Sequence, residues 1–373
     1  MSEPIRVAQV MGKMVGGGLE SVVMNYYRHI DHSRVQFDFI VDEDSTLIPR
    51  EEIETLGGRV FTVPPYQHVF AYQKALIGLF QEQGWQIVHS HENALSVFPL
   101  RAAKKAGVPV RIAHSHSTAG KGEHLRNAIK WVLRKFSRVY PTDFAACGVY
   151  AGEWLFGKNT DFTIFPNAIE LDRFISDSTV RANARAELRI SENTFVVGHA
   201  GRFVTQKNHM FLLRVFACIH ARIPQSLLLL AGSGPLMEKT KELAQELDID
   251  GSICFLGQRD DVNRLYQTFD AFILPSLYEG FPVVAVECQA SGTPILASDT
   301  ISPEVAITSL MEFESLSSGC QEWARHLLSM KGRGLSADDF KALHVYNIDK
   351  AARKLTDYYL SLLGDVSAKD GIH

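Results

Sequence analysis

The feature that most constrains the fold is an alternation that runs along the whole chain. Short runs rich in β-branched residues, each bounded by turn residues, alternate with longer amphipathic segments. This alternation predicts parallel sheets whose strands are joined by crossover helices. The strands expected in the first half are Ile5–Met11, Val35–Val41, Arg59–Val63, Gln86–His91, Val110–His116 and Asp143–Cys147. Those expected in the second half are Phe195–Ala200, Ser226–Ala231, Ile253–Leu256, Ala271–Pro275 and Pro294–Ser298.

The pattern divides into two domains, which a length of 373 residues also favours. Each half opens with a strand that runs into a glycine-containing loop. The boundary is expected near Phe165-Pro166-Asn167-Ala168, because proline restricts the residue before it and asparagine tolerates turn geometry. We therefore predict an α/β fold of two doubly wound, Rossmann-like domains, residues 1–167 and 168–348. The second domain begins with a linker, residues 168–190, that holds one short helix.

The last segment, residues 349–373, is predicted to be a terminal helix with a polar tail. The helix is expected from Asp349 to Leu363, and the tail from Gly364 onward is expected to fray. The apolar residues that share one helical face are Ala352, Leu355, Tyr359 and Leu362. In open α/β sheets, ligands bind outside the carboxyl ends of the strands. The active site is therefore expected in a cleft between the two domains.

Composition favours a globular protein. Hydrophobic residues make up 46% and charged residues 21% of the chain. No apolar run approaches the ~20 residues that cross a bilayer, and the first strand is interrupted by Arg6 and Gln9, unlike a signal peptide. The cysteines are isolated, so neither a disulfide framework nor a zinc site is favoured. We predict a soluble or peripheral protein of the cytoplasm. The cysteines are Cys147, Cys218, Cys254, Cys288 and Cys320.

The charge balance argues against nucleic acid as a partner. Residues 1–167 hold 18 Lys and Arg against 16 Asp and Glu, while the remainder holds 20 against 26, giving about +2 and −6. That asymmetry is too small for a nucleic-acid surface, and no RNP, helix-turn-helix or finger pattern accompanies it.

The strongest functional pattern follows the expected strand Ala271–Pro275. The run Ser276-Leu277-Tyr278-Glu279-Gly280-Phe281-Pro282 leads into a helix expected over Val283–Ser291, and its proline suits the first helical turn. Free N–H groups at that helix start can bind a phosphate. Glu279 lies before the helix and Glu287 within it, so one carboxylate can meet a sugar while the other reaches a ribose diol. The alternative is a helix start with two surface carboxylates.

The run E-G-F-P-V-V-A-V-E resembles the E-x7-E motif of retaining glycosyltransferases of family 4, which adopt the two-domain GT-B fold. The resemblance implies that Glu279 lies by the donor sugar and that Glu287 hydrogen-bonds the ribose hydroxyls. It also implicates Gly280 and Phe281, whose backbone N–H groups contact sugar hydroxyls, with Pro282 beside them.

A basic pair follows the first strand of the second domain, in His199-Ala200-Gly201-Arg202-Phe203 and Gln206-Lys207-Asn208. A diphosphate leaving group is strongly negative, and Arg with Lys can stabilise it as the glycosidic bond breaks. The pair is similar to the G-R…K signature of family 4, which makes Arg202 and Lys207 the expected diphosphate clamp. The alternative is two ordinary solvated cations.

The run Gly16-Gly17-Gly18 lies between the first strand and a helix expected from Leu19. Its backbone can approach a phosphate closely. It is neither a G-x-G-x-x-G fingerprint nor a Walker loop. In family 4 a similar loop reaches the donor phosphate, and a mere flexible turn is the alternative.

Histidines gather at two strand ends, in His89-Ser90-His91-Glu92 and His114-Ser115-His116-Ser117. Such a histidine can donate to a sugar hydroxyl without a full charge. Family members carry an active-site histidine after the second of these strands, which implies His116, with His114 as the alternative. His89 and His91 are possible contacts of an acceptor or phosphate, and a structural role is an equal interpretation.

Three weaker patterns remain, of which two are assigned to the site and one is not. Ala231-Gly232-Ser233-Gly234-Pro235 is similar to the G-x-G-P turn of the family, and the segment from Phe255 to Val262 is similar to its F-x-G segment, which implies that Gln258 and Arg259 contact the nucleotide. Asp42-Glu43-Asp44 contains a D-x-D, a pattern that would suggest a metal-dependent GT-A transferase, but an acidic turn after a strand is the better interpretation. In GT-B enzymes cationic side chains and helix ends do the electrostatic work of a metal, so the resemblance implies no metal, and no other cofactor is expected.

A basic stripe recurs at four-residue spacing in Arg126, Lys130, Arg134 and Arg138. Such a stripe can hold a helix against anionic lipid head groups, although a solvated face is the alternative. The predicted partners are a nucleotide-sugar donor, a saccharide or lipid-linked saccharide acceptor, and the inner face of a membrane.

Motifs from Gly16 to Glu287 appear in family order, so the resemblance covers nearly the whole chain. It also implies that the terminal segment, residues 349–373, is the crossover helix that packs back on the first domain in GT-B proteins. It implies a retaining transferase that uses a nucleotide diphosphate sugar, most often a UDP-sugar, in polysaccharide or glycolipid assembly, such as exopolysaccharide or capsule synthesis. Two alternatives stay open. One is a GT-B sugar-nucleotide epimerase or hydrolase, and the other is a non-catalytic nucleotide-sugar-binding protein.

Overall fold

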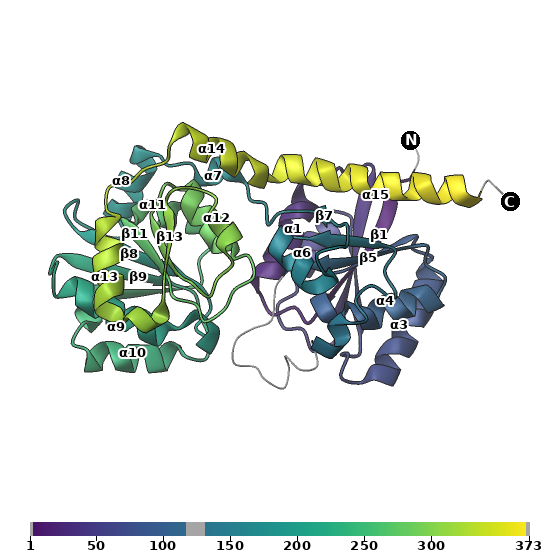
Figure 1. Cartoon of the computed structure of the whole chain (residues 1–373), viewed down its shortest axis with the longest axis horizontal. Coiled ribbons are helices and arrows are strands. Elements are labelled where there is room, and N and C mark those ends of the chain that lie inside the picture. Colours follow the sequence, from purple (N-terminus) through teal and green to yellow (C-terminus); the bar gives the residue numbers. More distant parts are fainter. Residues whose placement is uncertain (1–2, 117–130, 371–373) are drawn as a thin grey trace. The chain divides into compact units, whose positions relative to one another are not determined.

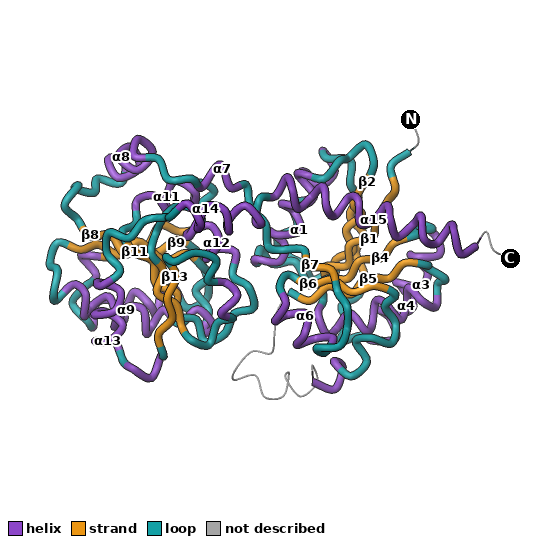
Figure 2. Tube along the Cα trace, turned by 45° about the horizontal axis from the view of Figure 1, so that its top comes forward, coloured by secondary structure: helices purple, strands orange, loops and turns teal. Residues whose placement is uncertain are grey.

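The computed structural model describes residues 3–116 and 131–370, and it divides the chain into two compact units. Unit 1 is Met1–Ala168 together with Asn347–His373, and unit 2 is Ile169–Tyr346. In each unit the strands gather in a central layer with helices around it (Figures 1 and 2). The expected α/β fold with two Rossmann-like parallel sheets is confirmed.

Unit 1 is built on a seven-stranded sheet in the order β3-β2-β1-β4-β5-β6-β7. All of its strand pairs are parallel. The β2 residues are buried along their whole length, which explains the nearly continuous apolar run in the sequence. The strands are β1 (Ile5–Gly12), β2 (Val35–Asp42), β3 (Arg59–Val63), β4 (Ile87–Ser90), β5 (Val110–Ser115), β6 (Asp143–Ala146) and β7 (Thr163–Ile164).

The helices of unit 1 cover both faces of this sheet (Figure 2). One apolar core joins α3 and α4 to the sheet through Tyr72, Leu76, Phe80 and Leu100, all buried. The helices are α1 (Gly18–His29), α2 (Arg50–Thr55), α3 (Val69–Gln83), α4 (Val97–Lys105), α6 (Val149–Phe156) and α15 (Ile348–Asp370), with a 3-10 turn η1 (Asn93–Ser96).

The terminal helix α15 belongs to unit 1 and packs against α1. Three residues of its predicted apolar face, Ala352, Leu355 and Tyr359, are buried, and Leu362 is half-buried. The prediction that the chain frays from Gly364 is wrong as far as Asp370, because the helix continues to that residue. A glycine inside a helix costs about 1 kcal/mol relative to alanine, which is too little to end a long helix by itself.

Unit 2 is built on a six-stranded parallel sheet in the order β10-β9-β8-β11-β12-β13. Its core packs α9 and α13 around the fully buried Trp323. The strands are β8 (Phe195–Ala200), β9 (Ser226–Ala231), β10 (Ile253–Gly257), β11 (Ala271–Leu274), β12 (Ile295–Ser298) and β13 (Met311–Glu314). The helices are α7 (Leu171–Phe174), α8 (Ser178–Glu187), α9 (His209–His220), α10 (Met237–Glu246), α11 (Val262–Thr268), α12 (Val283–Ala290), α13 (Cys320–Ser329) and α14 (Ala337–Leu343). The 3-10 turns are η2 (Thr205–Lys207), η3 (Asp250–Ser252), η4 (Pro303–Val305), η5 (Leu316–Ser318) and η6 (His344–Tyr346).

Three details differ from the sequence-based expectation. The strands β7 and β13 were not predicted, because β7 has two residues and β13 alternates with the acidic Glu312 and Glu314 at a sheet edge. Residues 168–190 hold two helices, α7 and α8, in place of one.

Among residues 3–116 and 131–370, no helix combines the length and the apolar character that are needed to span a bilayer.

Candidate active site

The loop after β11 carries Glu279 and leads into α12. Pro282 is the residue before the helix, with φ −67° and ψ 120°, so it ends the loop and does not lie in the first turn as expected. Phe281 is buried and stacks on Tyr346, with ring centroids 5.6 Å apart. Gly280 lies half-buried between Glu279 and this anchored ring. The predicted sugar-binding run is thus held by packing at its end.

Glu279 and Lys207 form a close ion pair. The Lys207 Nζ atom lies 2.6 Å from Glu279 Oε1, and the two side chains are 15% and 10% exposed. The Ser276 hydroxyl donates to the same carboxylate oxygen at 3.0 Å. The two residues that the sequence predicted for different tasks, diphosphate binding and sugar contact, therefore lie together in unit 2.

Three hydrogen bonds, one between backbone groups and two from side-chain amides, hold the loop of Lys207 against the loop of Glu279. The Leu277 N–H donates to the Gln206 carbonyl at 2.8 Å, and the Gln206 side-chain amide donates to the Tyr278 carbonyl at 2.9 Å. The Asn208 amide donates to the Pro275 carbonyl at 3.2 Å, with Asn208 in the left-handed region at φ 56°. Asparagine tolerates that conformation better than most residues.

Arg202 is exposed and lies in the loop directly after β8. Its guanidinium forms no ion pair with any residue in the part of the chain that the structure describes. The loop is held by the glycine turn after β9: a Cβ atom on Gly232 would lie 2.1 Å from the Gly201 carbonyl oxygen, and the Phe203 N–H donates to the Ser233 carbonyl at 3.0 Å. The G-x-G-P turn therefore positions the Arg202 loop by close backbone contact.

Glu287 lies on α12 and is half-buried. The Tyr266 hydroxyl donates to Glu287 Oε2 at 2.9 Å. Burial raises the pKa of Glu287 to about 7, although the bond from Tyr266 and the charge of Arg173 oppose this shift. Glu287 can therefore exchange a proton near neutral pH, while it accepts a hydrogen bond from a hydroxyl group.

The two expected nucleotide contacts follow β10. Gln258 is exposed, whereas Nε and Nη2 of Arg259 donate to the two carboxylate oxygens of Asp261, at 2.7 and 2.6 Å. These hydrogen bonds raise the pKa of Arg259. The planar guanidinium is thus held in one orientation beside the end of the strand.

The predicted glycine loop lies in unit 1, and its amides already bind a carboxylate of the same chain, that of Glu20. Gly16 has φ +76°, Gly17 caps α1, and Gly18 is the first helical residue. The Glu20 carboxylate accepts from the N–H groups of Val15 and Gly17, each at 2.9 Å. A phosphate that binds these amides has to replace Glu20.

The four histidines at the carboxyl ends of β4 and β5 form one cluster in unit 1. His89 pairs with His114 and His91 pairs with His116, through ring nitrogens 3.0 and 2.8 Å apart. Burial lowers the pKa of each imidazole, to about 3 for His89 and His116. The histidines are therefore neutral at physiological pH, and His116 is the most solvent-accessible of the four.

The basic stripe is described only in part, since Arg126 and Lys130 lie outside the described residues. The Arg134 guanidinium lies over the Trp154 ring, 5.3 Å from its centroid, and Arg138 donates to the Thr160 hydroxyl at 3.2 Å. The surface beside them is apolar as well as basic. It exposes Trp131, Val132, Phe136 and Val139, each by about half of its area.

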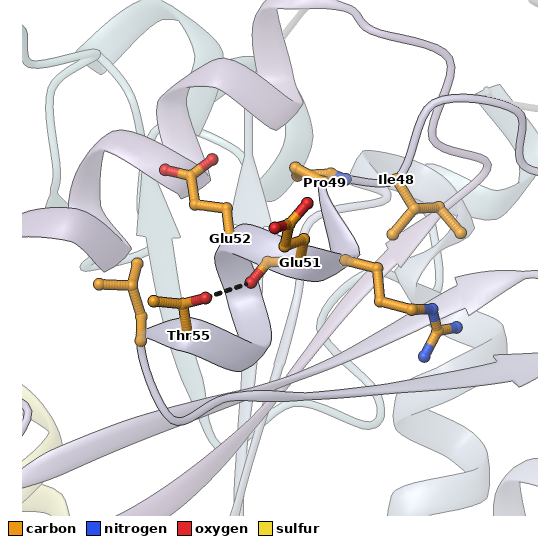
Figure 3. A pocket seen from close by; sticks show the side chains of 7 residues that line it. Ile48, Pro49, Glu51, Glu52 and Thr55 are labelled. Carbon is orange, nitrogen blue, oxygen red and sulfur yellow. Dashed lines mark hydrogen bonds between the residues drawn. The ribbon is translucent and has the colours of Figure 1, made fainter.

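The D-x-D of residues 42–44 has the character of an acidic turn. Asp42 is buried, and burial raises its pKa to about 6, while Asp44 pairs with Lys13 at 2.6 Å. A shallow hollow of about 630 Å³ lies nearby along the chain, over α2 (Figure 3). Two of its charged side chains form ion pairs, Glu52 with Arg28 and Arg50 with Glu54, and none of the predicted site residues lines it.

Solved glycosyltransferases share this fold. Anabaena HepE in complex with UDP-glucose matches with a TM-score of 0.77 and 16% identity, over 96% of this chain and 100% of that one. WaaG, a glycosyltransferase involved in lipopolysaccharide biosynthesis, matches with a TM-score of 0.68 and 15% identity, over 94% and 95% of the two chains. The architecture is the GT-B fold of glycosyltransferases, as the sequence predicted.

Sequence comparison then gives the family. Residues 180–310 match the family model for glycosyl transferases group 1, and residues 17–146 match the glycosyl transferase 4-like domain. The "Putative glycosyltransferase EpsF" of Bacillus subtilis (strain 168) is 36% identical over 345 residues, which are 90% of this chain and 90% of that protein. The chain belongs to the group 1 glycosyl transferases, and it is a glycosyltransferase.

A second relative has a more specific name. The UDP-Gal:alpha-D-GlcNAc-diphosphoundecaprenol alpha-1,3-galactosyltransferase of Escherichia coli is 23% identical over 384 residues, which are 96% of this chain and 97% of that protein. Both relatives extend over nearly the whole chain, so the likeness includes unit 1 as well as the donor-site motifs of unit 2.

Several residues at the site were not predicted from the sequence. Ser276 and Tyr266 hold the two carboxylates, and Gln206 and Asn208 join the two loops. The position of Ser276, three residues before Glu279 in a turn, was the available signal for the first contact. Tyr266 lies on a different helix, α11, so no local pattern connects it with Glu287.

Proposed function

We propose that this glycosyltransferase moves a sugar, with retention of configuration, from a UDP-sugar to a hydroxyl group of a saccharide or lipid-linked saccharide. The observation that carries the proposal is the partly buried ion pair of Lys207 and Glu279. The cation is suited to a diphosphate leaving group, and the carboxylate to a sugar whose anomeric carbon becomes positive. A site with both charges in contact meets the two electrostatic demands of glycosyl transfer.

In the proposed reaction, the acceptor oxygen bonds to the anomeric carbon on the face from which the diphosphate leaves. The bond between that carbon and the diphosphate oxygen breaks, and the acceptor proton passes to the departing phosphate. Arg202 and Lys207 stabilise the negative charge on the diphosphate. Glu279 orients the sugar, and Glu287 accepts from the ribose hydroxyls. These cations perform the work that a metal ion does in other transferases, so the proposal includes no metal.

The remaining predicted residues complete the substrate contacts. Gln258 and Arg259 lie at the carboxyl end of β10, where a nucleotide base can bind, and Gly280 to Pro282 lead into the free amino end of α12. His116, with His114 behind it, is the proposed sugar contact of unit 1. Gly16, Gly17 and Gly18 are proposed to receive a donor phosphate in exchange for the Glu20 carboxylate.

The relatives support the donor and the acceptor class. The name of the Escherichia coli relative gives UDP-galactose as its donor and a diphosphoundecaprenol-linked sugar as its acceptor. HepE was solved with UDP and with UDP-glucose. We therefore propose a UDP-hexose donor and a role in polysaccharide assembly, such as exopolysaccharide, at the cytoplasmic face of a membrane.

A lipid-linked acceptor requires contact with a membrane, and unit 1 offers a suitable surface. Exposed Trp131, Phe136 and Val139 lie beside Arg134 and Arg138, a combination of apolar and cationic side chains that binds anionic lipid surfaces. We expect binding to vesicles that contain phosphatidylglycerol to weaken in Trp131→Ser with Phe136→Ser. Unchanged vesicle binding would remove this part of the proposal.

The proposed function is tested with a panel of nucleotide sugars. A donor that binds at a hundred times its dissociation constant stabilises the protein by about 2.7 kcal/mol, which a thermal-shift assay detects. The best donor is then incubated with saccharide and lipid-linked acceptors, and we expect acceptor-dependent release of UDP. Lys207→Met should abolish transfer, whereas Lys241→Met, at an exposed ion pair on α10, should not. Epimerised donor without a transfer product would contradict the proposal, and so would donor binding without turnover.

A further inference from the structure

The four histidines of unit 1 are arranged as two hydrogen-bonded pairs, one stacked on the other. The rings of His89 and His114 are nearly coplanar, with an interplanar angle of 10° and a nitrogen–nitrogen distance of 3.0 Å. His91 and His116 form the second pair at 2.8 Å. His89 lies over His91 with ring centroids 4.3 Å apart, and His114 lies over His116 at 3.9 Å.

Two further side chains join the pairs into one continuous chain of hydrogen bonds. His91 Nε2 lies 2.8 Å from Gln9 Oε1, and Gln9 Nε2 lies 3.1 Å from the Tyr359 hydroxyl. The same hydroxyl lies 2.6 Å from His89 Nδ1. Gln9 comes from β1 and Tyr359 from the terminal helix α15, and both are buried. The chain therefore runs from His116 to His114 through residues of four different elements.

The Gln9 amide sets the direction of the bonds on one side. Its carbonyl oxygen can only accept, so His91 must donate to it from Nε2. A neutral imidazole has one N–H group, which leaves His91 Nδ1 as an acceptor. The neighbouring bond must then be donated by His116 from Nε2.

The same amide sets the direction on the other side. Its nitrogen can only donate, so the Tyr359 oxygen accepts that bond. Among the described residues the Tyr359 hydroxyl has His89 Nδ1 as its acceptor, so it donates a hydrogen bond to that nitrogen. His89 then donates from Nε2 to His114 Nδ1. The last N–H group, at His114 Nε2, is buried and has no partner among the described residues. The orientation of the Gln9 amide and the bond donated by the Tyr359 hydroxyl thus together determine the tautomers of all four histidines.

A metal site is the competing interpretation, because ligand atoms of His89, His91 and His114 lie within 4.8 Å of one another. The geometry opposes it. The lone pairs of each hydrogen-bonded pair point toward the partner ring, and the two pairs are stacked face to face. An ion between the layers would therefore meet ring faces, whereas an imidazole binds metal through a lone pair in its ring plane.

We propose that Gln9, Tyr359, His89 and His91 are positioning residues that hold His116 as the Nε2–H tautomer. His116 Nδ1 makes no hydrogen bond within residues 3–116 and 131–370. This unprotonated nitrogen is therefore the ring atom whose lone pair can bind a substrate. His116 then accepts a hydrogen bond and does not donate one. The role of His116 toward substrate rests on the proposed function, whereas its tautomer does not.

Burial supports the neutral state that this argument uses. Desolvation lowers the pKa of His116 to about 3, and the same cause lowers that of its partner His91. Such a weakly basic imidazole is unsuited to removing the acceptor proton at neutral pH. A positioning role through a fixed tautomer is therefore the function that this cluster can perform.

The tautomers are measured directly by long-range ¹H–¹⁵N NMR of the full-length protein, since protonated and unprotonated ring nitrogens resonate far apart. We expect His116 to be protonated at Nε2 in the wild type and to become a tautomer mixture in Tyr359→Phe. Gln9→Met breaks the chain at the next link and should give the same result if the first variant folds poorly. Tyr358→Phe, the same change one residue away on α15, should leave the spectrum unaltered.

Three outcomes overturn the inference. The first is Nδ1 protonation of His116 in the wild type, which corresponds to the reversed chain with the Gln9 amide turned over. The second is an unchanged His116 tautomer in both Tyr359→Phe and Gln9→Met. The third is a stoichiometric shift of the ring nitrogens of His89, His91 and His114 on addition of Zn²⁺, because in the proposed arrangement every lone pair of these three rings accepts a hydrogen bond.

Turnover gives a second readout. We expect kcat/KM to fall about 10-fold in Tyr359→Phe, as is typical when an orienting partner is lost, and to stay unchanged in Tyr358→Phe. Equal activity of Tyr359→Phe and wild type would also overturn the positioning role. A wild-type protein without any transfer activity would contradict the proposed function, and the NMR result would still decide the tautomer.

Discussion

Glu279 derives its orientation from its neighbours more than from its own place in the motif. One carboxylate oxygen accepts from Lys207 and from Ser276, and residue 279 also forms a parallel β-bridge with Ile301. The carboxylate is therefore fixed before any donor binds. A preoriented charge contributes more to transition-state stabilisation than one that must reorganise during the reaction.

Replacement of this charge should affect turnover far more than binding. Glu279→Gln keeps the shape of the side chain but removes the charge that faces Lys207. We expect kcat to fall by about 100-fold or more, while the dissociation constant of UDP changes little. Initial rates and calorimetric titration with UDP measure the two effects. Glu238→Gln, at an exposed ion pair on α10, is the matched control, and near-normal turnover of Glu279→Gln would refute the assigned role.

The pH dependence of donor binding should report on Glu287. Burial raises the pKa of this carboxyl group to about 7, so it is largely protonated in mild acid and ionised in mild base. The carboxylate is the better acceptor for two ribose hydroxyls, so donor affinity should rise as the pH increases through about 7. The KM for a UDP-sugar, measured across this range, should become independent of pH in Glu287→Gln. A wild-type profile that is flat would exclude the ribose contact.

The protonation of Glu287 also affects the stability of the folded protein. Its pKa in the folded protein lies above the ordinary value of 4.5, so the protonated form is favoured by folding. This contribution to stability is fully present below the unfolded pKa and is lost as the pH rises through about 7. Conditions that improve donor binding through Glu287 therefore weaken its contribution to folding.

At the scale of elements, Asp38 joins the first three strands of unit 1 at a single point. Its carboxylate accepts from Arg6 of β1 and Arg59 of β3, and from the Trp85 indole at 2.7 Å. Burial alone would raise the pKa of Asp38, but these hydrogen bonds outweigh it and lower the pKa. The stability that this group contributes is present above its unfolded pKa and is lost as the pH falls.

Loss of this charge should destabilise unit 1. We expect Asp38→Asn to lower the free energy of unfolding by about 2–3 kcal/mol, somewhat less than for a fully buried pair, because Arg6 and Arg59 remain partly exposed. Hydrogen exchange of the β1 and β2 amides measures the change in unit 1 alone. Asp357→Asn, at an exposed pair with Arg34, should cost less than ~1 kcal/mol. Equal exchange in the two variants would contradict this account of Asp38.

Most of the elements could be predicted from the sequence, because parallel strands buried on both faces give continuous apolar runs. Phe195–Ala200 and Ser226–Ala231, which are almost entirely buried, were predicted with the observed bounds. The edge strand Arg59–Val63 is mostly exposed or half-buried, and its β-branched residues sufficed to predict its bounds. The two missed strands lie at sheet edges, where pairing with one neighbour suffices and no such run is needed. The length of helix α15 was underestimated, because a glycine such as Gly364 is typical of a helix end, whereas this helix continues past it.

At the scale of the whole molecule, local motifs predicted the fold, the enzyme class and the candidate residues. The contacts between those residues depend on the tertiary fold. Lys207 and Glu279 are 2.6 Å apart although they come from loops after different strands. Gln9 and Tyr359 meet from opposite ends of the chain. The spacing of residues in the sequence cannot predict such a contact, because it forms only when the strands have their order in the sheet and the terminal helix has packed.

The central claim is transfer of a sugar from a UDP-sugar with retention. The most direct test is the anomeric configuration of the product, followed by ¹H NMR of the anomeric proton from the first turnovers. With an α-linked UDP-hexose and a hydroxyl acceptor, we predict an α-glycoside. Formation of the β-glycoside would contradict the account, because it requires attack from the face opposite the diphosphate and a different task for Glu279.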